Sequence, residues 1–180
     1  MSMKNTEILS RNTEVLRSLS TLPEKILRLH GTENVSEFVL YELSHEHCFN
    51  LPKAAFFVDN PDFKCFKGIT GFNKKDHPEY VSLWDEPEKF TDVMKNNSFN
   101  QKVRSINQCT AAHEQQAHKN PEHYLEDIAH QLDVRDLGFH RFPLKHGNHG
   151  LFVYDRHEAD IPDMQVFARG ACFLGFCPVF

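Results

Sequence analysis

The sequence has no apolar run close to the ~20 residues that a membrane-spanning helix needs. Its first 20 residues also lack the apolar centre of a secretory signal. Basic residues are not in excess, since the net charge is −5, so the chain has no electrostatic footprint for nucleic acid. We therefore expect neither a membrane nor a nucleic acid as a partner, and we expect the chain to be cytoplasmic.

The five cysteines form no Cys-x-x-Cys pair, and nothing in the sequence indicates secretion. We therefore expect reduced and mostly buried thiols. Tryptophan is scarce as well, with one residue, whereas phenylalanine occurs sixteen times. An aromatic-rich core is the simpler interpretation of this composition, and a hydrophobic ligand pocket lined by phenylalanine is the alternative.

The residue patterns predict an α+β fold, with an antiparallel sheet and helices packed against it. A first hairpin is expected from Ala54 to Gly71, because an apolar strand, the turn Asp59-Asn60-Pro61-Asp62 and an alternating strand follow one another. A second hairpin is expected over residues 137–155. A largely apolar helix should follow from Ile161 to Phe176, and we expect it to share one face of the sheet with the N-terminal helix.

Further helices are predicted before and between the two hairpins. One should begin near Asn34 and end near Leu43. Residues 73–98 are the least regular part of the chain. Two helices of a helical middle insertion should follow them, one from Phe99 to about Lys119 and one that begins with Asn120 as its cap and Pro121 in its first turn.

Residues 1–20 are predicted to form a separate N-terminal helix. Ile8, Val15 and Leu22 fall at heptad spacing, which is typical of a short coiled-coil seam. Two interpretations stay open: this helix docks on its own domain, or it pairs with a second copy of the chain. Thr21 and Pro23 fit the start of a new helix, so the main domain is predicted to span residues 21–180.

The order of these elements, together with several short motifs, resembles a GAF domain, a small sensory module. The resemblance covers about residues 22–72 and 137–176. Residues 73–135 depart from the family pattern, because they are longer and more helical. The motifs that carry the resemblance are Lys67-Gly68-Ile69-Thr70-Gly71-Phe72, Phe142-Pro143-Leu144 and Gly150-Leu151-Phe152-Val153.

The resemblance implies a cupped sheet that holds a small molecule, such as a cyclic nucleotide, a tetrapyrrole, a small metabolite or a metal centre. It also implies a homodimer through the terminal helices and signalling to an output domain. These 180 residues contain no output domain, so we expect one elsewhere in a longer chain or on a partner protein.

The ligand is expected between the sheet and the middle helices, close to aromatic side chains of the strands. Because successive side chains of a strand point to opposite faces, some of these aromatic residues should lie on the far face instead. The candidate ligand-binding residues are Phe57, Phe66, Phe72, Trp84, Phe139 and Phe142.

Twelve histidines keep a metalloprotein or a metal-dependent enzyme as an alternative function. His113 on one predicted helix, with His123, Asp127 and His130 on one face of the next, would supply ligands for a metal or for haem iron. A solvated polar face is the simpler interpretation of those residues. His45-Glu46-His47-Cys48 is a second group, and histidines that interact with a helix C-terminus are the simpler interpretation there.

No catalytic motif predicts a reaction, so no catalytic residue is assigned and a non-enzymatic role is expected. The leading hypothesis is a cytoplasmic sensory domain that binds a small ligand and signals through a dimer of terminal helices. A protein-interaction module without a ligand is the further alternative.

Overall fold

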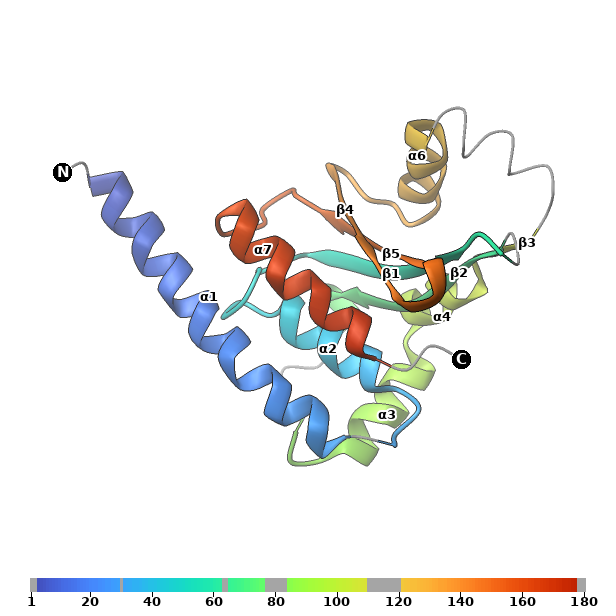
Figure 1. Cartoon of the computed structure of the whole chain (residues 1–180), viewed down its shortest axis with the longest axis horizontal. Coiled ribbons are helices and arrows are strands. Elements are labelled where there is room, and N and C mark those ends of the chain that lie inside the picture. Colours follow the sequence, from blue (N-terminus) through green and yellow to red (C-terminus); the bar gives the residue numbers. More distant parts are fainter. Residues whose placement is uncertain (1–2, 30, 63–64, 77–83, 110–120, 178–180) are drawn as a thin grey trace.

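The computed structural model describes residues 3–29, 31–62, 65–76, 84–109 and 121–177 (Figure 1). Within these ranges, every helix is too short or too polar to cross a membrane. The helices and strands are α1 (Met3–Arg28), α2 (Val35–Ser44), β1 (Lys53–Asn60), β2 (Cys65–Asn73), α3 (Pro87–Asn96), α4 (Ser98–Ser105), β3 (Asn107–Cys109), α6 (Pro121–Gln131), β4 (Leu137–Pro143), β5 (His149–Asp155) and α7 (Met164–Ala171).

β1 lies at the centre of a five-stranded antiparallel sheet with the order β3-β2-β1-β5-β4. β1 and β2 form the first predicted hairpin, β4 and β5 form the second, and the two hairpins join where β1 pairs with β5. The apolar run of β1 is buried on both faces because helices cover both sides of this central strand. The predicted α+β class with an antiparallel sheet is therefore confirmed.

α1, α2 and α7 pack together on one side of the sheet (Figure 1). Their apolar side chains meet those of β1 and β5 in the larger of the two hydrophobic clusters, the first cluster. The ring of Phe167 on α7 lies 4.5 Å from that of Phe49 and 4.8 Å from that of Tyr154, centroid to centroid. The prediction that the N-terminal and C-terminal helices share one face of the sheet is confirmed.

α4 and α6 contribute the helical side chains of the second cluster, on the opposite face of the sheet. α4 approaches β2 closely at Gly68, where a Cβ atom would lie 1.9 Å from the carbonyl oxygen of Val103. The Gly68 N–H donates to the carbonyl of Ile106 at 2.8 Å, which ties the end of α4 to the strand. α6 adds Leu125 and Ile128, and Leu132 follows directly after the helix; all three are fully or nearly buried.

The predicted helix start at Thr21 is wrong, because α1 continues through Pro23 to Arg28. The Thr21 hydroxyl donates back to the carbonyl of Ser18 at 2.9 Å, so it does not cap a new helix. The helix continues because residues on both sides of Pro23 dock on the same cluster. α1 therefore crosses the position at which the sequence placed a domain boundary.

Two of the three residues of the predicted heptad seam, Ile8, Val15 and Leu22, are buried in the domain and cannot pair with a second copy. Val15 and Leu22 have 0% exposed surface and pack into the first cluster. For these two residues the structure selects docking on the chain's own domain. Ile8 remains 57% exposed, near the end of α1 that projects away from the body (Figure 1).

Two other predicted boundaries also differ from the structure. The helix predicted over residues 99–119 ends at Ser105, because residues 107–109 pair with β2 as β3; residues 110–120 lie outside the described residues. The final helix begins at Met164 rather than near Ile161, since Asp163 is its N-cap and accepts from the Gln165 N–H at 2.8 Å.

Candidate metal centre

The chain leaves α2 through a tight turn that carries His45, Glu46 and His47. α2 ends at Ser44, and His45 adopts an extended backbone with φ −66° and ψ 160°. The carbonyl of His45 accepts from the N–H groups of Cys48 at 3.0 Å and Asn50 at 2.9 Å. These two hydrogen bonds fix the turn, so the three side chains stand beyond the helix end rather than around its surface.

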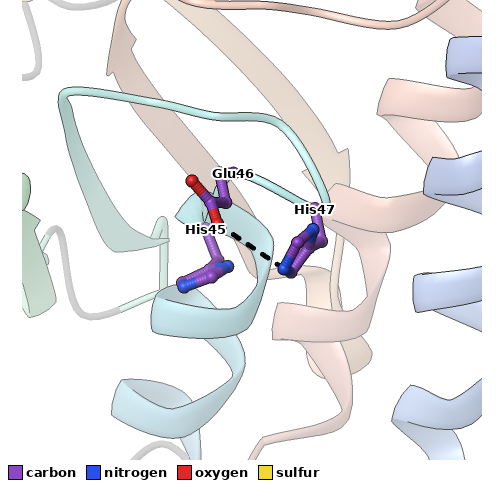
Figure 2. Close-up of side chains that lie close together, drawn as sticks. All are labelled: His45, Glu46 and His47. Carbon is purple, nitrogen blue, oxygen red and sulfur yellow. Dashed lines mark ion pairs between the residues drawn. The ribbon is translucent and has the colours of Figure 1, made fainter. Parts of the chain in front are cut away.

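Figure 2 shows that His45, Glu46 and His47 lie around a common point, although they are consecutive residues. One potential ligand atom from each lies within 4.8 Å of the other two. The two imidazole rings are 5.1 Å apart between centroids. On a helix these histidines would diverge, so the turn is what brings them together.

α1 contacts this turn through Glu14 and Arg11. Oε1 of Glu14 lies 3.6 Å from Nδ1 of His47, whereas Nε2 of His47 lies 3.6 Å from Oε1 of Glu46. Arg11 pairs with Glu14 at 3.1 Å and donates to the carbonyl of Cys48 at 2.6 Å. Two side chains of α1 thus join the turn that carries the three candidate ligands.

Burial lowers the pKa of His45 below its ordinary value, and the neighbouring His47 lowers it further. The neutral imidazole, which is the metal-binding form, is therefore favoured at this position. Burial raises the pKa of the adjacent Cys48 thiol to about 12. The candidate ligand set consists of two imidazoles and one carboxylate, because these are the side chains whose ligand atoms lie within 4.8 Å of one another.

The metal-binding residues predicted on the middle helices do not belong to the group at His45. His113 and the side chain of His123 are outside the described residues. Asp127 and His130 belong to α6 and are exposed. In the described part of the chain, the group at His45 is the one in which three such side chains come within metal-binding reach of each other.

No protein-family model, curated protein or solved structure matches this chain.

The six aromatic residues predicted to bind a ligand are divided between the two faces of the sheet. Phe57 and Phe66 stack at 4.9 Å on the face that α4 and α6 cover. Phe139 is on the same face, because it lies opposite Val153 in the β4–β5 pair, and it is 49% exposed. The other three pack in or against the first cluster: Phe72, Trp84 and Phe142.

A buried carboxylate, Glu37, was not among the predicted site residues. It is 2% exposed and accepts from Asn100 at 2.8 Å, Arg104 at 3.1 Å and Asn34 at 3.1 Å. Asn100 in turn accepts from the Gly71 N–H at 2.9 Å. These bonds satisfy the carboxylate and join α2, α4 and β2, so the network serves the fold. Glu37 and Asn100 are 63 positions apart in the sequence, and no local pattern predicts that their side chains meet.

Proposed function

We propose that this chain is a cytoplasmic, GAF-like sensory domain that pairs with a second copy through α1 and responds to a small ligand. The antiparallel sheet, the terminal helices on one face and the helical middle segment on the other support this assignment. The observation that carries the proposal is a second apolar stripe on α1, which the domain itself leaves exposed.

α1 has an inner and an outer apolar stripe. The inner stripe is buried in the first cluster and consists of Val15, Leu19 and Leu22. The outer stripe consists of Leu9, Leu16 and Leu27, which are 63%, 45% and 70% exposed. At 3.6 residues per turn, the three outer leucines lie within about 20° of one another around the helix and about 110° from the inner stripe.

The outer stripe has the spacing of a coiled-coil seam. Leu16 follows Leu9 by seven residues, which is one heptad. Leu27 follows Leu16 by eleven, which is one heptad plus the four-residue step between the two seam positions. Thr13 and Ser20 occupy seam positions between the leucines, and their hydroxyls already donate to main-chain carbonyls of α1 at 2.8 Å and 2.7 Å. These hydroxyls can therefore enter a helix pair without an unsatisfied donor.

A second copy of this chain is the partner that suits the seam. Its six positions, Leu9, Thr13, Leu16, Ser20, Pro23 and Leu27, carry no charge, so two copies can meet without apposing like charges. The N-terminal turns of α1 also extend beyond α7 (Figure 1). A paired α1 would connect two domains, and a ligand that prefers one arrangement of the pair would shift the equilibrium between arrangements.

The ligand is proposed to lie on the α4 and α6 side of the sheet, beside Phe139. Among the exposed large apolar side chains that the structure describes, Phe139 is the one that belongs to a strand. Phe57 and Phe66 stack on the same face, so aromatic rings are gathered there. An exposed ring on such a surface can stack with an aromatic part of a small molecule.

Sedimentation equilibrium of the full chain tests the pairing. The wild type should reach about twice the chain mass of 20.9 kDa as its concentration rises. Leu16→Glu places a charge in the seam and should leave a monomer, whereas Arg17→Glu on the neighbouring exposed position should leave the dimer intact. A wild-type mass of one chain at every concentration would contradict the proposal.

A thermal-shift screen of small aromatic metabolites and nucleotides, confirmed by calorimetry, tests the ligand surface. A compound that stabilises the wild type should bind Phe139→Ala at least tenfold more weakly. Phe176→Ala is the matched control, because Phe176 is 72% exposed but lies outside the sheet. Equal binding to both variants would place the ligand away from Phe139.

A further inference from the structure

We propose that His45, Glu46 and His47 bind one divalent transition-metal ion, for which Zn²⁺ is the best fit, and that Glu14 of α1 supports this site from its outer shell. The site lies apart from the surface around Phe139. It adds a metal-dependent contact between α1 and the domain to the role proposed above.

The three side chains match the ligand preferences of Zn²⁺. Imidazole nitrogen and carboxylate oxygen are common zinc ligands, and three protein ligands leave a fourth position for water. Ligand atoms around a tetrahedral zinc ion are about 3.3 Å apart, because each metal–ligand distance is about 2.0–2.1 Å. The present separation is at most 4.8 Å, so the ligand atoms must move closer by up to about 1.5 Å to bind the ion.

The exposure of the three residues shows how the site can close. His45 is half-buried and its ring lies 5.9 Å from that of Tyr41, so it provides a fixed ligand. The side chains of Glu46 and His47 are 62% and 65% exposed, and they can rotate toward the ion. Because the ligands are consecutive and the turn is already hydrogen-bonded, binding orders little additional chain.

Glu14 is placed to orient His47. It lies beside Nδ1 of the ring, and Nε2 points toward Glu46. A carboxylate on one imidazole nitrogen holds the proton there and leaves the other nitrogen free for the metal. Arg11 binds both Glu14 and the carbonyl of Cys48, so the carboxylate is itself held in position.

Metal binding at this site is expected to affect the position of α1. A metal on Nε2 of His47 would strengthen the interaction of Nδ1 with Glu14 and would hold α1 against the turn. α1 is also the helix that carries the outer stripe. Metal occupancy is therefore expected to favour the docked position of the helix through which the domain is proposed to pair.

The test is a Zn²⁺ titration of the full chain after treatment with a chelator, followed by the ring nitrogen resonances of the histidines. Zn²⁺ should shift the signals of His45 and His47, and its affinity at this site should fall at least 100-fold in His47→Ala. Glu14→Gln should weaken binding by about 10–100-fold, as outer-shell changes do. Unshifted His45 and His47 signals at saturating Zn²⁺ would overturn the proposal.

A matched control distinguishes specific zinc binding at this site from weak zinc binding by any exposed His–Glu pair. His157 and Glu158 lie 3.5 Å apart on the surface, as His47 and Glu46 do, but without a second histidine in a described cluster. His157→Ala should leave the affinity at His45 unchanged. A loss in His157→Ala equal to that in His47→Ala would show unspecific surface binding and would also overturn the proposal.

Amide hydrogen exchange tests the link to α1. Zn²⁺ should slow exchange in the part of α1 around Glu14 in the wild type but not in Glu14→Ala. Equal slowing in both proteins would refute the outer-shell role of Glu14. His47 is exposed, so its substitution leaves the core intact, and the melting temperature without metal should stay at the wild-type value.

Discussion

Leu22 and Leu27 are the same residue type on the same helix, yet the first has 0% exposed surface and the second has 70%. Leu22 belongs to the inner stripe and meets side chains of the first cluster, whereas Leu27 belongs to the outer stripe. Their helical propensity and hydrophobicity are identical, so only tertiary neighbours separate them. The comparison teaches that α1 is a structural helix of the domain that leaves an apolar stripe exposed on its other side, where the chain is proposed to pair.

The largest expected effect comes from truncating one leucine of each stripe. Leu22→Ala should lower the free energy of unfolding by about 2–5 kcal/mol, because it removes buried methyl groups and leaves a cavity. Leu27→Ala should change the stability of the separate protomer by no more than about 0.5 kcal/mol. Urea denaturation at low protein concentration, where pairing does not contribute, measures both. Equal losses would mean that the two stripes do not differ as the structure shows.

The next effect concerns polar contacts between α1 and the rest of the domain. The Arg11 side chain is only 15% exposed, donates to the carbonyl of Cys48 and forms an ion pair with the carboxylate of Asp160. Arg11→Met should cost about 1.5–3 kcal/mol, the range for hydrogen bonds to charged groups. Arg17→Met, on an exposed position of the same helix, should cost almost nothing. Urea denaturation checks both values, and equal stability of the two variants would remove the role assigned to Arg11.

The smallest effect separates two ion pairs of α1. The side chains of Lys25 and Glu42 are 28% and 18% exposed, and Lys25 also lies 5.0 Å from the centre of the Trp84 ring. Lys25→Met should cost up to about 1 kcal/mol, and less at high salt. Arg28 and Glu24 are 75% and 71% exposed, so Arg28→Met should have no measurable effect. Thermal unfolding at two salt concentrations distinguishes them, and a larger loss in Arg28→Met would contradict the assignment.

The two hairpins of the sheet could be predicted from the sequence because their signals are local, whereas the short edge strand β3 was predicted as helix. The apolar run of β1, its turn and the alternating residues of β2 specify a hairpin without reference to the rest of the chain. α1 shows the limit of such reasoning. A seven-residue apolar spacing is the same whether the partner is another copy or the chain's own core, so the pattern that included Val15 and Leu22 did not reveal which one covers them.

The candidate metal site could be predicted only in part from the sequence. The sequence shows two histidines and a glutamate in succession, but a helical continuation would spread them and an extended one would align only the histidines. Their approach depends on the extended backbone at His45 and on the hydrogen bonds that close the turn, neither of which is encoded in a motif. Glu14 lies more than thirty positions away in the sequence and meets His47 through the docking of α1.

The most direct test of the central claim is isotope-filtered NMR on a mixture of labelled and unlabelled chains. The account predicts intermolecular contacts from the methyl groups of the outer stripe, Leu9, Leu16 and Leu27, and none from the inner stripe. Intermolecular contacts from Leu22, or a complete absence of such contacts at concentrations where wild-type chains are associated, would contradict it.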